Sequence, residues 1–329
     1  MTPRRLLLSA RLRHELGEAV AAAAAGCELE VLTLEQVVDD EACTVHAAFI
    51  SRDVTALSTK HEVQEPLAGC YRVLRRSPEL AWVHSHSAGT DRPIYVELTA
   101  RGVAVTTSAG ANAEIVAQTA LGGVLALARR FPQLLAAQSR REWAPLVAGP
   151  PPPDLAGQTL VLVGWGAIAQ RLQRWLAMLG LTVIVARHGP APAGPGIETV
   201  RYGDLAAVLP RAQWLLLACP LSDATRQLVD AATLARLPAG AMFVNVARGE
   251  VVDEAALIDA LRAGRLGGAF IDVFEHEPLA PESPLWALPN TIVTPHAAGH
   301  SAGNAARAAA IFIDNLGRWL RAEALRNRA

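Results

Sequence analysis

The sequence has no excess of charge of either sign. Its 30 basic and 31 acidic residues leave a formal net charge of -1 over 329 residues. A chain so nearly neutral lacks the strong positive field that draws proteins to nucleic acid or to an anionic membrane surface. We therefore expect neither nucleic acid nor a membrane among its partners, although the composition alone does not exclude a local basic patch.

Cysteine is scarce and scattered. The sequence contains only Cys27, Cys43, Cys70 and Cys219. These residues form no CxxC pair, and their spacing is not that of metal ligands. The pattern therefore predicts reduced thiols in a cytoplasmic protein and no metal site.

Long apolar runs are missing as well. No stretch reaches the roughly 18 consecutive apolar residues that a membrane-spanning helix needs. Near the start, Arg4 and Arg5 precede leucines as in a twin-arginine signal, but the apolar run ends at Ala10 and Arg11 follows it. We interpret residues 5–9 as a first β-strand and expect a cytoplasmic location.

Apolar residues are abundant and regularly arranged. They make up half of the sequence, and the chain is long enough for two hydrophobic cores. Short runs rich in Val, Leu and Ile alternate with helix-length segments, which is typical of parallel sheets buried on both faces. The expected strands are 5–9, 29–33, 46–51, 80–85 and 102–108 in a first set, and 159–164, 181–186, 214–218, 241–246, 268–273 and 291–294 in a second.

This alternation predicts an α/β fold with two doubly wound parallel sheets. Residues 112–140 form a long apolar helical region, which is interrupted too often to cross a membrane. The four consecutive prolines within 148–157 predict a stiff loop just before the second set of strands. Residues 303–329 form an amphipathic helix that can pack back on the first unit.

A glycine-rich turn follows the first strand of the second set. The stretch GWGAIA at 164–169 matches the G-x-G-x-x-(G/A) pattern of dinucleotide-binding turns. Gly164 permits the tight turn, Gly166 lets the main chain approach a pyrophosphate, and Ala169 allows close packing. The helix that begins near Ile168 offers unpaired N–H groups to phosphates. Such turns also serve packing alone, but the flanking strand and helix favour cofactor binding.

Three further stretches follow strands of the second sheet, at the edge where open α/β sheets bind ligands. They carry Arg248, then Asp272, Glu275 and Glu277, then His296 and His300. Reduction of a 2-oxo acid needs a cation that holds the carboxylate and polarises the ketone, which an arginine fork supplies. It also needs a proton donor with a pKa near 7, which a histidine beside a carboxylate supplies.

Together, the stretches VGWGAIA, NVARG, IDVFEHEPL and TPH resemble the D-isomer-specific 2-hydroxyacid dehydrogenase family, nearest to its glyoxylate/hydroxypyruvate reductase branch. The matching stretches extend from SHSAGTD at 85–91 to SPLWALPNTIVTPH at 283–296, so the resemblance covers almost the whole chain. It implies an NAD(P)H-dependent reduction of a small 2-oxo acid to the D-2-hydroxy acid by hydride transfer.

The resemblance also implies roles for the charged residues. Arg248 would bind and polarise the substrate, and His296 would be the general acid/base, paired with Glu277. This assignment prefers Glu277 to Glu275 and His296 to His300.

A loop in the first half of the chain completes the implied substrate site. The main chain of Ser87, Ala88 and Gly89 matches the family loop whose N–H groups hold the substrate carboxylate. His84 and His86 stand beside this loop, where smaller or apolar residues are common in the family. These two histidines either only line the mouth of the pocket or bear on which substrate side chain is preferred.

The implied cofactor contacts extend beyond the glycine turn. Asp272 matches the family residue near the nicotinamide carboxamide, and Cys219 with Pro220 matches a loop beside the adenosine, where Cys219 serves by its size. The implied cofactor-binding residues are Gly164, Gly166, Ala167, Ile168, Arg187, His188, Cys219, Pro220, Thr225, Ala247 and Asp272.

The family architecture implies two domains and a homodimer joined through the cofactor domains. Residues 1–107 and 300–329 would form a flavodoxin-like substrate domain, and 108–299 an NAD(P)-binding Rossmann domain. Trp143 falls where some reductases of this branch place a tryptophan that reaches the partner's active site. An anchor for the dimer or for a loop is the alternative role. Gln118 and Ala169 depart from the family pattern, in which glutamate and glycine are usual.

An arginine stands where NAD-using relatives carry their ribose-binding aspartate. Arg187 follows the strand at 181–186, and His188 comes next. An aspartate there repels a 2′-phosphate, whereas an arginine pairs with it. We expect NADP(H) to be favoured over NAD(H), with His188 as an additional contact. The alternative is that Arg187 stacks on adenine or points to solvent.

Two other kinds of function stay open. A dinucleotide-sensing scaffold without turnover, like the co-repressors of this fold, needs a protein-binding surface, and the sequence shows no long disordered arm or recognition motif. Phosphoglycerate, formate or phosphite dehydrogenation would use the same fold. Formate enzymes pair their histidine with glutamine, where this chain has Glu277, and no regulatory domain is expected after residue 329.

Overall fold

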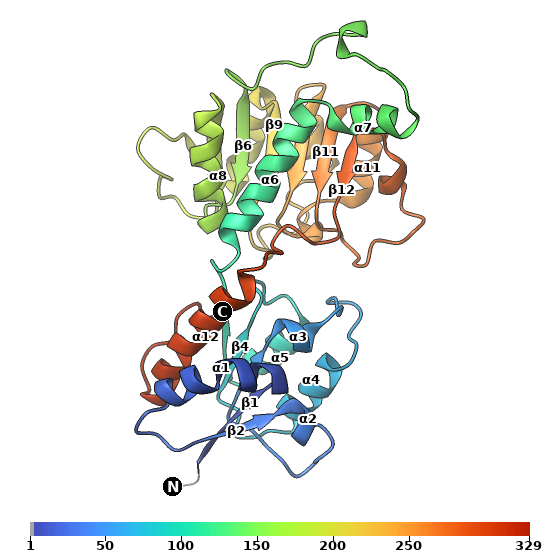
Figure 1. The fold of residues 1–329 in the computed structure, drawn as a ribbon. Coiled ribbons are helices and arrows are strands. Elements are labelled where there is room, and N and C mark those ends of the chain that lie inside the picture. Colours follow the sequence, from blue (N-terminus) through green and yellow to red (C-terminus); the bar gives the residue numbers. More distant parts are fainter. Residues whose placement is uncertain (1–2) are drawn as a thin grey trace. The chain divides into compact units, whose positions relative to one another are not determined.

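The computed structural model describes residues 3–329, which form two compact α/β units (Figure 1). The first unit runs up to Asn112 and resumes with Ser301–Ala329, and the second unit is Ala113–His300. The junctions thus lie at 112/113 and 300/301, where the sequence predicts 107/108 and 299/300. No helix among residues 3–329 is long and apolar enough to cross a membrane.

The first unit is built on a five-stranded parallel sheet with the order β2-β1-β3-β4-β5. This is the strand order of flavodoxin-like folds. The strands are β1 (Arg4–Leu8), β2 (Leu29–Thr33), β3 (Ala47–Ile50), β4 (Trp82–Ser85) and β5 (Ala104–Thr107). The helices are α1 (Ala10–Ala23), α2 (Leu34–Val37), α3 (Arg52–Thr55), α4 (Leu67–Arg75), α5 (Pro93–Ala100) and α12 (Asn304–Leu320).

Both faces of the first sheet are buried. Successive side chains of a strand point to opposite faces, and each set lies in its own core. In β1, Leu6 and Leu8 join a core that includes Phe312 of α12, whereas Leu7 joins a core that includes Leu67 of α4. The C-terminal segment thus belongs to the first unit. Beyond α12, the chain reaches the edge strand β5, where the Thr107 N–H donates to the carbonyl of Asn327 at 3.0 Å.

The second unit contains a seven-stranded parallel sheet with the order β12-β11-β10-β9-β6-β7-β8. Chain order reverses between β6 and β9, as in a doubly wound dinucleotide-binding fold. The strands are β6 (Thr159–Val163), β7 (Thr182–Arg187), β8 (Thr199–Arg201), β9 (Trp214–Leu217), β10 (Ala241–Asn245), β11 (Leu266–Ile271) and β12 (Thr291–Val293). The sequence analysis did not predict β8. It expected β11 to begin at residue 268 rather than at Leu266, because Gly267 and Gly268 do not favour a strand.

Helices cover both faces of the second sheet (Figure 1). They are α6 (Ala113–Ala128), α7 (Phe131–Ser139), α8 (Ala167–Met178), α9 (Leu205–Val208), α10 (Ala231–Ala235) and α11 (Glu254–Arg262). Short 3-10 helices are η1 (Leu146–Ala148), η2 (Tyr202–Asp204), η3 (Leu209–Arg211), η4 (Gly249–Val251) and η5 (Pro284–Ala287). The helical region expected at 112–140 is split into α6 and α7, because Arg130 has a left-handed φ of 55°.

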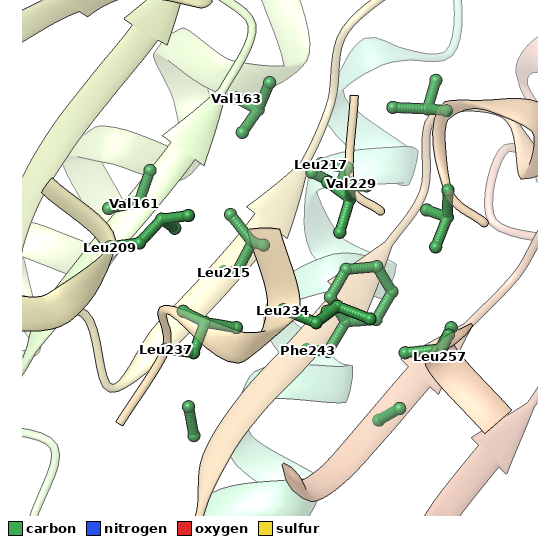
Figure 2. Close-up of a cluster of buried hydrophobic side chains, with 14 of the residues drawn as sticks. Val161, Val163, Leu209, Leu215, Leu217, Val229, Leu234, Leu237, Phe243 and Leu257 are labelled. Atoms are coloured by element: carbon green, nitrogen blue, oxygen red, sulfur yellow. The ribbon is translucent and has the colours of Figure 1, made fainter. Parts of the chain in front are cut away.

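The hydrophobic core of the second unit fixes the positions of its strand ends. On one face, alternate residues of β6 and β9 meet Phe243 of β10 and leucines of α10 and α11 (Figure 2). On the other face, Leu160, Leu162 and Leu216 pack with residues of α6 and α8. The carboxyl ends of these parallel strands therefore emerge along one well-supported edge.

Candidate active site

The glycine turn joins β6 to the N-terminus of α8. Gly164 has a φ of 106°, and a Cβ there would lie 2.6 Å from the carbonyl oxygen of Ala218, so only glycine fits. Gly166 is the N-cap of α8, and a Cβ on it would meet no atom within 4 Å. Ala169 is fully buried. The turn thus leaves room for a phosphate at the open N–H groups of α8, and it fits a dinucleotide.

Two arginines lie side by side beyond this turn. Arg187 ends β7, and its Nη1 donates to the carbonyl of Ala191 at 3.2 Å. Arg201 of β8 is its partner in the β7–β8 register, so both side chains start from the same face of the sheet. The centre of the His188 ring lies 6.3 Å from that of Tyr202. Sequence reasoning missed Arg201 because β8 has only three residues.

The loop after β9 is held by its own polar groups. Thr225 is buried, and its hydroxyl donates to the carbonyl of Pro220 at 2.7 Å. The hydroxyl oxygen of Thr225 also accepts from the Ser222 N–H at 2.8 Å. Burial raises the pKa of the Cys219 thiol to about 12. Thr225 therefore holds the loop, and Cys219 packs as a neutral thiol.

The Arg248 loop is fixed by Asn245 at the end of β10. The side-chain amide of Asn245 donates to the carbonyl of Arg248 at 3.1 Å, and its oxygen accepts from the Ala247 N–H at 3.0 Å. Arg248 Nη1 donates to the carbonyl of Ala247 at 2.7 Å. Gly249 follows, and a Cβ on it would collide with the main chain of Phe274. The first residue of the NVARG stretch thus shapes the loop, a role that the sequence analysis did not assign.

His296 and Glu277 form a direct pair. His296 Nδ1 lies 2.8 Å from Glu277 Oε2. The other oxygen of Glu277 accepts from the Phe274 N–H at 3.2 Å. Burial works to raise the pKa of Glu277, but the His296 hydrogen bond and the charges of His296 and Arg248 outweigh it and lower the pKa. Glu277 therefore stays an anion that acts on the imidazole.

Asp272 positions the segment that carries His296. Its Oδ1 accepts from the Thr294 hydroxyl at 2.6 Å and from the Ala297 N–H at 2.8 Å, and its Oδ2 accepts from the Ala298 N–H at 3.0 Å. Its main-chain carbonyl accepts from the His296 N–H at 2.8 Å. Asp272 is 2% exposed, and burial raises its pKa. The sequence had no signal for this use of both its main chain and its side chain.

His296 itself has an uncommon main-chain conformation. Its φ of 51° lies in the left-handed region, which few residues other than glycine adopt. The hydrogen bonds that Asp272 accepts from His296 and the residues after it hold it there. Among the alternatives left by the sequence, Glu275 Oε1 accepts from the Glu254 N–H at 3.5 Å. The His300 main-chain N–H donates to Ala297. The structure thus brings His296 together with Glu277, the acid that the sequence analysis preferred.

The Ser87–Gly89 loop follows β4 in the first unit. The Ser87 hydroxyl donates to the carbonyl of Gly89 at 3.0 Å, and the Ser87 N–H donates to the Ser85 hydroxyl at 3.2 Å. The Tyr95 hydroxyl in turn donates to Ser85 at 2.8 Å. Within residues 3–329, no group accepts a hydrogen bond from the N–H of Ala88 or of Gly89. A loop held in place with two unused donors can bind a carboxylate.

The two histidines beside this loop differ completely in environment. His84 is fully buried, with Nδ1 2.8 Å from the Thr106 hydroxyl and Nε2 3.1 Å from the Ser108 hydroxyl. His84 is therefore a core residue and does not line the mouth of a pocket. His86 lies just beyond the strand, and its N–H donates to the carbonyl of Ile50 at 3.0 Å.

Comparison with known proteins matches the second unit to a defined family. The NAD binding domain of the D-isomer specific 2-hydroxyacid dehydrogenases matches residues 121–298, more than half of the chain. The chain is 34% identical over 282 residues to glyoxylate/hydroxypyruvate reductase B of Klebsiella pneumoniae strain 342, which covers 84% of each protein.

Solved structures agree over the whole chain. A D-isomer specific 2-hydroxyacid dehydrogenase of Xanthobacter autotrophicus Py2, in complex with NADPH and MES, is 30% identical, with a TM-score of 0.74 over 100% of this chain and 98% of that one. An NADPH-dependent glyoxylate/hydroxypyruvate reductase of Sinorhizobium meliloti, in complex with NADP and malonate, is 27% identical, with a TM-score of 0.75 over 100% and 97%. The glycine turn, the strand order and these likenesses agree: the chain belongs to the D-isomer specific 2-hydroxyacid dehydrogenase family of oxidoreductases.

Proposed function

We propose that this enzyme uses NAD(P)H to reduce a small 2-oxo acid of the glyoxylate or hydroxypyruvate type to the D-2-hydroxy acid. The observation that carries the proposal is the 2.8 Å contact between His296 Nδ1 and Glu277 Oε2. A carboxylate that accepts from Nδ1 fixes the tautomer and strengthens Nε2 as a proton carrier. The names of the relatives support the same chemistry.

In this proposal, His296 transfers the proton, and Arg248 interacts with the negative charge of the substrate. When bound, the dinucleotide supplies a hydride to the C2 carbonyl carbon of the substrate. The carbonyl oxygen takes a proton from Nε2 of the His296 imidazolium, which becomes neutral. The negative charge of Glu277 stabilises the imidazolium before that transfer. Arg248 binds the substrate carboxylate and polarises the carbonyl.

We propose that the Ser87–Gly89 loop also binds the substrate carboxylate. The unused N–H groups of Ala88 and Gly89 suit a carboxylate, because each offers a hydrogen bond that no protein group within residues 3–329 takes. Main-chain N–H groups can bind a carboxylate without adding another protein charge to the site. Ser87 supports them by fixing the loop.

Steady-state kinetics test this function directly. Purified enzyme is given NADPH or NADH with glyoxylate, hydroxypyruvate, pyruvate and phenylpyruvate, and the loss of reduced cofactor is followed. Glu277→Gln should reduce kcat by about 100-fold, because the imidazolium loses its counter-charge. Glu282→Gln is the matched control, since Glu282 is exposed. No turnover of any substrate, with tight dinucleotide binding retained, would support the sensor function instead.

We further propose that NADP(H) is the preferred cofactor. Arg187 and Arg201 present two positive charges on neighbouring strand ends, and the sequence has no ribose-binding aspartate at that position. Such a pair suits a 2′-phosphate. Two related structures were solved with NADPH or NADP. Titration should give a lower Kd for 2′,5′-ADP than for 5′-AMP, and a clear kcat/KM preference for NADH would reject this assignment.

The second unit also carries a surface suited to a second copy of the chain. Four apolar side chains between residues 131 and 147 are exposed: Phe131 by 49%, Leu135 by 58%, Trp143 by 95% and Val147 by 90%. Several large exposed apolar side chains on one segment are typical of an interface. We propose that this segment, which extends away from the sheet of its unit (Figure 1), forms the interface of a homodimer. Light scattering should show a dimer that Trp143→Asp dissociates and that Met178→Asp, at another exposed apolar site, leaves intact.

A further inference from the structure

A group of basic side chains lies beside the Ser87–Gly89 loop of the first unit. In the β3–β4 register, Ile50 is the partner of Ser85, and the His86 N–H continues the ladder by donating to Ile50 at 3.0 Å. Arg52 and Ser87 each stand two residues beyond this pair. They therefore start from neighbouring positions on the same edge of the sheet, because adjacent strands lie about 4.8 Å apart.

Arg92 brings a second guanidinium to the same place. Its Nη1 donates to the carbonyl of Thr59 and its Nη2 to the carbonyl of Ser58, both at 2.7 Å. Both contacts are to main-chain carbonyls, which are uncharged, so they do not neutralise the guanidinium. Arg92 is thus held rigidly by the segment that follows α3.

The charges of this group are not balanced. Burial lowers the pKa of Arg52, and the nearby charge of Arg92 lowers it further. In the part of the chain that the structure describes, no acceptor pairs with the Arg52 guanidinium. Asp53 is its neighbour in the sequence, and the carboxylate of Asp53 accepts from the Ser51 hydroxyl at 2.6 Å. Arg52 is exposed to solvent and stands near another cation, so a bound anion would offset the repulsion between the two guanidinium groups.

His86 completes the group as a neutral side chain. Burial, and then the charges of Arg52 and Arg92, lower the pKa of His86 to about 4, although Asp53 opposes this. Its Nδ1 lies 3.5 Å from the Thr55 hydroxyl. At neutral pH a histidine of this kind adds no charge, but it can donate one hydrogen bond.

We propose that Arg52, supported by His86 and Arg92, binds a second anionic group of the substrate, so that the preferred 2-oxo acid carries a further carboxylate, sulfonate or phosphate. This inference rests on the proposed function, because it takes the neighbouring Ala88 and Gly89 donors to hold the first carboxylate. Glyoxylate has no second anion and would leave Arg52 unpaired. A dianionic substrate satisfies both the main-chain donors and the guanidinium.

The test compares substrates that differ only in the remote group. Oxaloacetate, 3-sulfopyruvate and 3-phosphohydroxypyruvate are compared with the monoanionic 2-oxovalerate, and glyoxylate gives the basal activity. These three substrates also distinguish which kind of second anionic group is bound. In the wild-type enzyme at least one dianion should exceed 2-oxovalerate in kcat/KM by about tenfold or more, because a charge-assisted hydrogen bond is added.

Arg52→Gln should remove this advantage, mainly through a higher KM, while glyoxylate turnover stays within about twofold. Arg52→Lys should keep part of it, because the charge remains. Arg13→Gln, at an exposed position of α1, is the matched control and should change neither substrate class. Equal kcat/KM for dianions and 2-oxovalerate, or an equal loss for glyoxylate and dianions in Arg52→Gln, would overturn the inference and leave the proposed function standing.

A binding measurement separates the two proposals if turnover is absent. Isothermal titration of the wild-type protein with oxaloacetate and with 2-oxovalerate needs no chemistry. Tighter binding of oxaloacetate that Arg52→Gln abolishes supports the anion subsite even when every 2-oxo acid is inert, and equal binding of the two refutes it.

Discussion

Acidification should destabilise the first unit through His84, because the hydrogen bonds around this buried ring admit only its neutral form. Trp82 Nε1 donates to the Thr106 hydroxyl oxygen at 2.8 Å, so the Thr106 proton is free to point at His84 Nδ1, 2.8 Å away. His84 Nε2 then donates to Ser108, whose hydroxyl donates to the carbonyl of Ser85 at 3.0 Å. A second proton, on Nδ1, would point at the proton of the Thr106 hydroxyl, so the protonated ring would lose this hydrogen bond.

The magnitude follows from the difference in pKa between the folded and the unfolded chain. Burial, with a smaller contribution from His86, lowers the pKa of His84 to about 3, whereas an unfolded histidine has a pKa of about 6.5. Between these values the unfolded state binds the extra proton, so stability falls as the pH falls below about 6.5, and the loss levels off near pH 3. At pH 5 the loss from this one side chain is about 2 kcal/mol, since each pH unit corresponds to about 1.4 kcal/mol.

Urea unfolding of the wild type and of His84→Gln at pH 7 and pH 5 measures this loss. Glutamine can accept from Thr106 and donate to Ser108 but does not titrate, so the free energy of unfolding of the wild type should fall by about 2 kcal/mol more than that of the variant. Hydrogen exchange of β4 and β5 peptides assigns the change to the first unit. His14→Gln, at an exposed position of α1, should retain the wild-type loss. An equal loss in the wild type and in His84→Gln would refute the reasoning.

Three further predictions concern the second unit. His296→Ala should lower kcat by about 100-fold or more while the Kd for NADPH, from fluorescence titration, stays near the wild-type value; a near-normal kcat removes His296 as the acid. Arg248→Ala should raise KM and lower kcat together, because the residue binds and polarises the substrate, and a change in kcat alone in steady-state assays contradicts a carboxylate clamp. Gly166→Ala should keep the wild-type Tm but weaken dinucleotide binding, whereas Gly249→Ala should lower the Tm because its Cβ meets the main chain of Phe274; equal Tm values for both variants count against this geometry.

The strands were predictable wherever several apolar residues follow one another. The strand expected at 159–164 is β6 within one residue, because its near-continuous Val and Leu content suits burial on both faces. By contrast, β8 escaped prediction because Thr199–Arg201 has three residues and follows a run of glycine and proline. Its pairing with β7 is a long-range contact that no local pattern records.

The placement of the charged residues at one edge of the sheet was predictable for a different reason. Arg248, Glu277 and His296 each follow a strand, and the carboxyl ends of parallel strands share an edge. What surrounds them was not predictable. His84 and His86 have the same parity in one strand segment, yet the first lies under α12, with its ring centre 5.8 Å from that of Phe312, and the second lies past the end of the strand. Depth along the strand, which alternation does not encode, separates a core histidine from a site residue.

The two carboxylates nearest to His296 have opposite tasks, and their environments explain why one chain segment needs both. The side-chain oxygens of Asp272 accept hydrogen bonds from Thr294, Ala297 and Ala298, and burial raises the pKa of this carboxyl group. Its main-chain carbonyl also accepts from the His296 N–H, so Asp272 holds the main chain that carries the imidazole. Glu277 meets the ring directly and keeps a lowered pKa despite its burial. A single acid could not do both, because a carboxylate whose acceptor sites are filled by main-chain N–H groups has little left to stabilise an imidazolium. Separating position from charge lets the left-handed backbone of His296 be held rigidly while Glu277 still responds to the proton on the ring.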